Sequence, residues 1–458
     1  MFRLVNAIAT RPWHPHLRIV AGMRWIVAGT VAAALLAVAP LAHGNGRPPL
    51  TNGIYLQPGD AHSMYVRSTF GLLISHDDGC TMRWVCEQNV GYAGSFDPKY
   101  AIGSDGTIFA TTYSGLRISR DAGCSFSTAG GGLPADAWID ALDIGPAGEI
   151  WVGTSTTGAT NDVFSSNDNG ATFTSRGMLS ATIWWKSVKV APSNPMRVYV
   201  AGYQVAGTLA DGGMMPPTGH FFRSDDDGAH WTESAMANVV FGPMPYLVVA
   251  AIDPTNPDIL YAISPGANPP GGDQLYRSAD GGTTFTSVLS TPMPISDVVI
   301  RDANTVIAAT ENSGSFQSTN GGTSFAAMAS PPQLACLKQK SDGSLIGCGA
   351  NWTPDFMSVT KSTDGSAWSP VWRFVQLAGP LECPAGTAEH DICDLQQWSN
   401  LQVQFASTGP TCGAFIVDGT PPDSPPKKGG GCCDAGDATG GLVLGVLVLG
   451  LVGRRRRR

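Results

Sequence analysis

Positive charge is scarce in this sequence. Lysine and arginine together number 28 in 458 residues, against 36 aspartates and glutamates, and all charged residues make up only 14% of the chain. Nine of the arginines lie within residues 1–44 and 454–458, so the rest of the chain has 19 basic and 36 acidic residues. A surface that binds nucleic acid needs clustered lysine and arginine. The sequence therefore predicts no nucleic-acid partner.

The sequence also lacks the motifs of several enzyme classes. It has 8 histidines and no Gly-x-Ser-x-Gly nucleophile elbow, so Ser-His-Asp hydrolase chemistry is not expected. No Cys-x-x-Cys pair or group of histidines accompanies the ten cysteines, which argues against a zinc site. We therefore assign no catalytic residue and expect neither a metal centre nor a cofactor.

What the sequence does have is a repeat. The pattern Ser-x-Asp-x-Gly-x-Thr/Ser-aromatic, called the box turn below, occurs seven times in intact or altered form, with first serines 44, 47, 58, 54, 40 and 44 residues apart. This period suits a four-stranded propeller blade. We therefore expect an all-β, seven-bladed β-propeller with four-stranded antiparallel blades. The third positions of the seven copies are Asp77, Asp121, Asp168, Asp226, Asp280, Asn320 and Asp364.

The box turn is expected to be structural. Its aspartate can accept hydrogen bonds from backbone N–H groups a few residues further on, its glycine supplies a positive φ, and its hydroxyl closes the turn. Because the strands alternate in direction, the turns between first and second strands share one face of the disc with the box turns. The loops between second and third strands, and the links between blades, emerge on the opposite face, where ligand sites are expected.

Three aromatic residues occupy equivalent positions on that opposite face. When three blades are aligned on the proline after the first strand, Trp138, Trp184 and Tyr246 each lie eight positions before it. They could form a stacking platform for a carbohydrate or a peptide, or they could pack between adjacent blades. We take these three residues as the candidate binding site, beside the long loop of residues 204–219, and both alternatives stay open.

Eight cysteines precede residue 432, and an even number in an exported chain favours disulfides. Cys336 and Cys348 flank a Ser-Asp-Gly-Ser turn and are expected to pair across a hairpin. Cys383 and Cys393 are expected to close a short loop. The sequence leaves open how the remaining four pair, which are Cys80, Cys86, Cys124 and Cys412.

The N-terminal region predicts export. Residues 1–44 contain four arginines and no acidic residue, and residues 25–39 are apolar except for Gly29 and Thr30. This pattern is typical of a signal peptide, with an uncleaved membrane anchor as the alternative. Translation could begin at Met1 or at Met23. At the other end, residues 420–431 are rich in proline and glycine and are expected to form a linker.

Residues 432–458 combine a Cys432-Cys433 pair, an apolar run over residues 442–452 and five final arginines. This order resembles the myxobacterial C-terminal sorting tail called MYXO-CTERM. The resemblance implies a short transmembrane helix, cleavage near Cys432 by a sorting protease, and attachment to the membrane at the cell surface through a lipid-modified cysteine. Cys433 departs from the pattern and leaves open which thiol is used. A permanent tail anchor is the alternative.

The repeat itself resembles the Asp-box, or bacterial neuraminidase repeat, of sialidases, sortilin-like receptors and xyloglucanases. Sialidase chemistry requires an arginine cluster for the substrate carboxylate, yet the Arg-Ile-Pro motif that opens such enzymes is absent. Arg117, Arg223 and Arg277 directly precede their box turns. Because these positions are equivalent in the strands, they suit blade packing better than a converging triad.

Xyloglucanase-like chemistry would need two opposed carboxylates, for which Asp136, Asp140 and Asp297 on the inter-blade links are the candidates. We expect instead a binding or scaffold module of the bacterial envelope, anchored at the outer membrane, with an unidentified glycan or protein ligand. A sialidase-like or xyloglucanase-like glycoside hydrolase is the alternative. The expected propeller covers residues 50–375, and a cysteine-containing extension packed on it covers residues 376–419.

Overall fold

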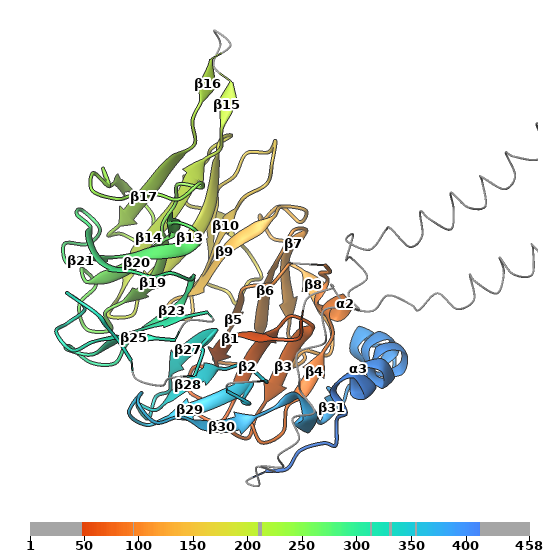
Figure 1. Cartoon of the computed structure of the whole chain (residues 1–458). Coiled ribbons are helices and arrows are strands. Elements are labelled where there is room, and N and C mark those ends of the chain that lie inside the picture. Colours follow the sequence, from red (N-terminus) through yellow and green to blue (C-terminus); the bar gives the residue numbers. More distant parts are fainter. Residues whose placement is uncertain are drawn as a thin grey trace, which may run out of the picture. The chain divides into compact units, whose positions relative to one another are not determined.

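The chain folds into seven blades around a central channel (Figure 1). The computed structural model describes residues 48–412, apart from residue 95 and residues 209–212, 312–313, 329–331 and 353–354. Each blade has four antiparallel strands, and the first blade gains a fifth, parallel strand at its outer edge, so the predicted seven-bladed propeller is confirmed. The predicted signal peptide, linker and sorting tail lie outside the described residues. Within the described residues, no helix has the length and apolar character needed to cross a membrane.

The first three blades contain β1 (Thr51–Leu56), β2 (Met64–Ser68), β3 (Gly71–Ser75) and β4 (Arg83–Val85); β5 (Tyr100–Ile102), β6 (Ile108–Thr112), β7 (Gly115–Ser119) and β8 (Ser127–Thr128); and β9 (Ile139–Ile144), β10 (Ile150–Thr154), β11 (Val163–Ser166) and β12 (Thr174–Ser175). A short helix, α2 (Glu87–Val90), joins the first blade to the second.

Blade 4 contains β13 (Ile183–Ala191), β14 (Asn194–Gln204), β17 (Thr218–Ser224) and β18 (Thr232–Glu233). The last three blades contain β19 (Val248–Ile252), β20 (Leu260–Asn268), β21 (Gly272–Ser278) and β22 (Thr286–Ser290); β23 (Ile295–Ile300), β24 (Val306–Thr310), β25 (Phe316–Ser318) and β26 (Ala326–Ala327); and β27 (Cys336–Gln339), β28 (Leu345–Cys348), β29 (Val359–Ser362) and β30 (Ser369–Trp372). The first strand of every blade borders the central channel.

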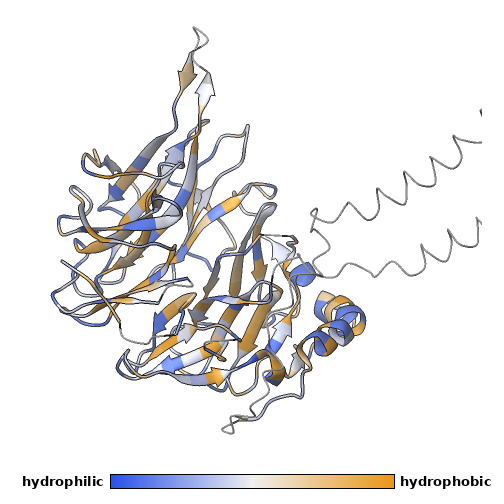
Figure 2. Cartoon of the chain, in the orientation of Figure 1, coloured by the Kyte–Doolittle hydropathy of each residue, from blue (hydrophilic) through white to orange (hydrophobic). Residues whose placement is uncertain are grey.

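Buried apolar side chains fill the spaces between neighbouring blades. One cluster joins Phe109 of β6 to Val152 of β10, and another joins Tyr199 of β14 to Tyr276 of β21. Figure 2 shows the hydrophobic residues running along the strands of the sheets. The blades therefore pack face to face as separate sheets, each sharing its core with the next one around the ring.

The box turn between the third and fourth strands is closed by its own side chains. In the third copy, Ser166 Oγ donates to Asp168 Oδ1 at 2.7 Å and accepts the N–H of Gly170 at 2.9 Å. Asp168 also accepts the backbone N–H and the hydroxyl of Thr172, at 2.8 and 2.6 Å. The hydroxyl of Thr172 and these other donors lower the pKa of Asp168 to about 2. The serine bonds to aspartate (or asparagine) and to glycine recur in all seven copies.

The glycine of the box turn also lets the preceding blade approach closely. Gly282 has φ +80°, and a Cβ placed there would lie 2.4 Å from the Cε1 atom of Phe221 in blade 4. Any larger residue would therefore have both an unfavourable backbone conformation and a steric clash. The box glycine thus serves the turn and the packing between blades at the same time.

Seven polar side chains connect neighbouring blades, because each forms a hydrogen bond with the box turn of the following blade. Each donates to a backbone carbonyl or to an aspartate carboxylate of the next box turn around the ring, at 2.6–3.4 Å. Two of the arginines discussed above, Arg223 and Arg277, act in this way, whereas Arg117 bonds to Val90 O and to Thr128 and Phe126 of its own blade. The seven donors are Asn89, Arg120, Arg176, Arg223, Arg277, Arg301 and Lys340.

The ring closes between blades 7 and 1 without exchange of a strand, because each blade is built from its own segment of the chain. Thr51 Oγ1 donates to the carbonyl of Ser358 at 2.6 Å, and Lys340 pairs with Asp78 across the same boundary at 2.6 Å. The chain then continues along the outer edge of blade 1. This extension contains η1 (Phe374–Gln376), β31 (Gly379–Pro380), the π-helix η2 (Glu389–Gln397) and α3 (Trp398–Phe405), and β31 pairs in parallel with β4.

Disulfides fix the extension to the first two blades. Cys336 and Cys348 pair across the β27–β28 hairpin, so that prediction is confirmed. The predicted Cys383–Cys393 disulfide is wrong. The pairing of β31 with β4 places each of these residues beside a cysteine of the propeller. The three bonds of the extension are Cys80–Cys412, Cys86–Cys393 and Cys124–Cys383, with Cα–Cα distances of 4.9, 5.4 and 5.5 Å.

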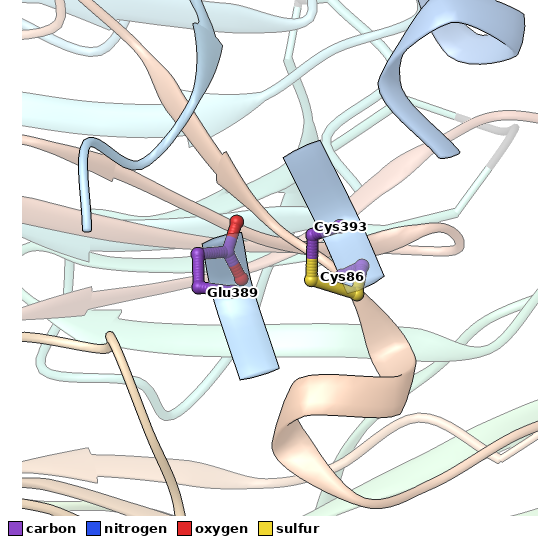
Figure 3. Close-up of side chains that lie close together, drawn as sticks. All are labelled: Cys86, Glu389 and Cys393. Atoms are coloured by element: carbon purple, nitrogen blue, oxygen red, sulfur yellow. A yellow bond between two sulfur atoms is a disulfide. The ribbon is translucent and has the colours of Figure 1, made fainter. Parts of the chain in front are cut away.

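A buried glutamate lies beside one of these disulfides (Figure 3). Glu389 of η2 has no exposed surface and accepts a hydrogen bond at 2.9 Å from Asn89 Nδ2, which also donates to the carbonyl of Gly123 in the second box turn. Burial raises the pKa of Glu389 to about 8, because desolvation disfavours the charged form. The carboxyl is therefore neutral over the lower part of the physiological range.

Replacing a box serine should destabilise the propeller. In Ser166→Ala, the buried N–H of Gly170 loses its acceptor, and we expect the free energy of unfolding to fall by about 1–3 kcal/mol. Chemical denaturation measures the change. Ser104→Ala, at an exposed serine outside the box turns, is the matched control and should stay within about 0.5 kcal/mol of the unmodified protein. Equal effects of the two changes would contradict a structural role for the box serine.

Glu389 should make stability depend on pH. Its pKa is about 8 in the folded protein and 4.5 in an ordinary glutamate, so between these values the folded state holds a proton that the unfolded state has lost. The free energy of unfolding should therefore fall as pH rises from 4.5 to 8, by on the order of 4 kcal/mol for this group. Denaturation at several pH values should show a shallower fall in Glu389→Gln, which does not titrate. An identical slope in both proteins would contradict the assignment.

Candidate functional site

The two faces of the propeller carry different chemistry. The box turns and the turns between first and second strands lie on one face, the box face, where arginine, lysine and asparagine donors engage the box turns. The other face, called the link face, carries the inter-blade links and the loops between second and third strands. Figure 1 shows the largest of these loops, the hairpin of β15 (Gly207–Thr208) and β16 (Met214–Met215), extending beyond β14 and β17 of blade 4.

The predicted aromatic residues lie on the link face, where the first strands begin. Trp138 precedes β9, Trp184 is the second residue of β13, and Tyr246 precedes β19. The rings of Trp138 and Trp184 meet edge to face, with centroids 5.5 Å apart. Tyr246 is joined to them through Tyr203, which lies 5.9 Å from Trp184 and stacks on Tyr246 at 5.6 Å. The structure thus brings the three predicted residues into one contiguous group.

The group continues onto blade 2 through two aromatic residues that the sequence did not single out. The ring of Tyr113, in the β6–β7 hairpin, lies 4.9 Å from that of Trp138 and 4.4 Å from that of Phe96. We call the whole set the aromatic arc, and it spans blades 2 to 5. Its members are Phe96, Tyr113, Trp138, Trp184, Tyr203 and Tyr246.

The arc is both packed and accessible. Trp138, Trp184 and Tyr246 are half-buried, Tyr203 is buried, and Tyr113 is 55% exposed. Burial raises the pKa of the Tyr246 hydroxyl to about 12. Trp138, Trp184 and Tyr246 therefore contribute part of their surface to contacts between neighbouring blades and leave another part open on the link face. Both alternatives considered for these residues, blade packing and an exposed stacking surface, are compatible with this geometry.

A lysine sits beneath the arc at the edge of the central channel. Lys186 Nζ lies 4.8 Å from the ring centroid of Trp138 and 5.6 Å from that of Tyr246, which are cation–π distances. It also pairs with the carboxylate of Asp140, and Lys99 lies 3.5 Å from the same carboxylate. Burial lowers the pKa of Lys99, against the opposing effect of Asp140. The cation under the arc is thus already neutralised by the protein itself.

The central channel has a volume of about 930 Å³ and a lining of paired charges. Lys189 pairs with Asp143 at 2.6 Å, and Lys338 pairs with Asp297 at 2.6 Å. In both pairs the aspartate also accepts a backbone N–H from the next blade, so these contacts connect the first strands of adjacent blades. Four of the six lysines between residues 48 and 412 border the channel, which are Lys99, Lys186, Lys189 and Lys338.

The carboxylates considered for hydrolysis have different surroundings. Asp140 is held by Lys186 and Lys99, whereas Asp297 is held by Lys338 in another part of the ring. Asp136 is exposed on the link between blades 2 and 3. Two of the three candidates are therefore committed to ion pairs between first strands.

One group of three potential metal ligands occurs in the part of the chain that the structure describes. The ligand atoms of Cys86, Glu389 and Cys393 lie within 4.8 Å of one another (Figure 3). Both sulfur atoms belong to the same disulfide, and a metal ion is bound by thiolates rather than by disulfide sulfurs. This group therefore stabilises the extension and offers no metal centre in the oxidised protein.

No family model matches the chain, and none of the curated proteins matches it. Among solved structures, an ancestral GH74 enzyme superposes with a TM-score of 0.51 at 16% sequence identity, covering 73% of this chain and 48% of that one. A GH74 xyloglucanase from Xanthomonas campestris gives 0.44 at 16% identity, covering 73% and 61%. YCF48 from Cyanidioschyzon merolae gives 0.44 at 14% identity, covering 66% and 92%.

The chain spans less than two thirds of the length of these GH74 enzymes. At such low identity, the likeness concerns the fold and not the activity. The superposition on the ancestral GH74 enzyme supports the propeller architecture that the strand pairing shows directly. The chain is thus similar in fold to the ancestral GH74 enzyme.

Proposed function

We propose that this protein is an exported binding module of the bacterial envelope whose ligand contacts the aromatic arc. The observation that carries the proposal is the continuity of the arc, in which Trp138, Trp184 and Tyr246 share one face of three adjacent blades. Half-buried tryptophan and tyrosine residues have a fixed orientation and present apolar area at little entropic cost. A glycan or a protein segment can contact such a surface.

The distribution of hydrogen bonds supports the choice of this face. On the box face, the arginines and Lys340 are engaged with neighbouring box turns, so their charges serve the fold. The link face instead carries long loops and partly exposed rings such as Tyr113. Connecting loops on a rigid scaffold are where binding residues concentrate.

The anchoring is part of the proposal. The predicted signal peptide would export the chain, and the predicted tail would hold it at the cell surface after processing near Cys432. In the described part of the chain, Cys412 is bonded to Cys80 in the first box turn. Cys412, near the C-terminal end of the described residues, therefore lies on the box side of blade 1. An anchor attached there would leave the link face free to meet a ligand.

The hydrolase alternative has no comparable support. It requires two carboxylates on opposite sides of a bound sugar, with one of them available as an acid. Asp140 and Asp297 are paired with lysines in the channel instead. Turnover of a sialoside or a β-glucan that disappears in Asp136→Asn, Asp140→Asn or Asp297→Asn would establish the hydrolase and overturn the binding proposal.

Removing the predicted aromatic residues should abolish ligand binding. We expect the triple variant Trp138→Ala, Trp184→Ala, Tyr246→Ala to lose at least about tenfold in affinity, because each stacked ring contributes about 0.5–1.5 kcal/mol beyond its buried area. The probes are a glycan array and synthetic peptides, with affinities measured by fluorescence anisotropy. Circular dichroism should show that the triple variant keeps its β-sheet content.

Trp231→Ala is the matched control for this experiment. Trp231 lies by the fourth box turn, and its Nε1 donates to the carbonyl of Arg176 at 2.9 Å. This change should lower stability and leave ligand binding unaltered. If the triple variant unfolds while Trp231→Ala does not, the three aromatics act in blade packing and the proposed site is wrong.

A further inference from the structure

Exposed apolar side chains are concentrated on one part of the link face. Eight large hydrophobic residues are strongly exposed in the described chain, and five of them lie in loops of blades 2 to 5. Leu179 is 67% exposed and Val240 is 60% exposed, each in a link between blades. We call this set the apolar rim, and its members are Tyr113, Leu179, Met214, Val240 and Met244.

Two members of the apolar rim, Tyr113 and Met244, contact the aromatic arc at its opposite ends. Tyr113 belongs to both, since its ring contacts those of Phe96 and Trp138. Met244 touches the other end of the arc, because its sulfur accepts a hydrogen bond from Tyr203 Oη at 3.7 Å. Large exposed apolar side chains gathered on one part of a protein surface usually mark a contact with another molecule.

The composition of the rim favours a polypeptide over a sugar. Leucine and valine side chains form no hydrogen bonds with hydroxyl groups, and methionine is only a weak acceptor that adapts its shape to varied apolar side chains. Within the arc, the edge-to-face contacts of Trp138 with Trp184 and of Trp184 with Tyr203 use part of the ring faces that a sugar would need. The surface as a whole is therefore better matched to apolar side chains than to a glycan.

The charge of the protein specifies the partner further. Residues 48–412 contain 32 acidic and 16 basic residues. Twelve of the 16 basic residues lie in box-turn contacts, in one ion-pair cluster or along the channel. Six bond to box turns, which are Arg120, Arg176, Arg223, Arg277, Arg301 and Lys340. Arg197 pairs with Asp225 and Asp258, and the channel is bordered by Arg67, Lys99, Lys186, Lys189 and Lys338. The protein therefore has a strongly negative field, which attracts basic molecules and repels acidic ones.

We infer that the ligand of the aromatic arc is a basic polypeptide segment that places apolar side chains on the rim. This inference rests on the proposed function and names its ligand class. The apolar side chains supply the contact area, and lysine or arginine around them supplies attraction to the acidic protein. A lipid surface is disfavoured, because anionic headgroups would meet the same negative field.

Three designed peptides test the inference on the purified protein. The first is a 15-residue peptide with leucine, methionine and phenylalanine between lysines and arginines, the second has glutamates in place of the basic residues, and the third has serines in place of the apolar ones. We expect the first to bind at least about tenfold more tightly than either of the others, as measured by fluorescence anisotropy. Its affinity should fall when the salt concentration is raised from 0.05 to 0.5 M.

Variants then locate the contact. In Tyr113→Ser, Leu179→Ser, Met244→Ser we expect the first peptide to bind at least about tenfold more weakly, because anchoring side chains at the centre of a contact dominate its affinity. The matched control is Met196→Ser, Leu395→Ser, Val403→Ser, which removes three exposed apolar residues outside the link face. The control should bind like the unmodified protein.

Each outcome has a distinct meaning. Equal binding of the basic and acidic peptides, or equal loss in the rim and control variants, overturns the inference. If a glycan array gives binding that the Trp138, Trp184 and Tyr246 substitutions abolish while no peptide binds, the ligand class is wrong and the proposed function stands. Binding to phosphatidylcholine vesicles in place of peptides shows that the rim meets a membrane. If peptides, glycans and vesicles all fail to bind, the proposed function itself is wrong.

Discussion

The contact between a box turn and the preceding blade is the constraint on which the whole ring depends. The serine and aspartate of the turn satisfy its N–H groups, as Ser166 and Asp168 do for Gly170 and Thr172. The carbonyls of the turn are then available to donors on the neighbouring blade, such as Arg301, which donates to Asp364 O and Thr363 O. A single motif therefore builds a blade and joins it to the next, which allows sheets of different loop length to form one closed ring.

This local character explains which parts of the fold could be predicted. The number of blades followed from the box turns because all their bonds lie within a few residues of sequence. The Cys336–Cys348 disulfide followed from its hairpin for the same reason. The bonds of Cys383 and Cys393 did not, since their partners Cys124 and Cys86 are brought near only by the pairing of β31 with β4.

Some residues of the candidate site could also be predicted from the sequence, and others could not. Trp138, Trp184 and Tyr246 could be found because they repeat at one position of the blade. Tyr203 could not be found by that alignment, because it lies at the end of a second strand and reaches the arc by pairing directly with Trp184. Tyr203 could have been found only from the register between the first two strands of the blade, and that register cannot be predicted without knowing where the strands end. Tyr113 depends on the contact between two blades, for which the sequence had no pattern.

The placement of the basic residues has a consequence for the resistance of the protein to proteases. Proteases of the trypsin type cut after lysine or arginine and need several residues of extended, accessible chain around the bond. Most such residues here lie in strands, in the channel or in bonded turns of the ring, as Lys189 and Arg223 do. Lys361 is exposed, but it lies within β29 and is paired on both sides by β28 and β30. The folded ring should therefore withstand these enzymes under conditions in which unfolded chains are degraded.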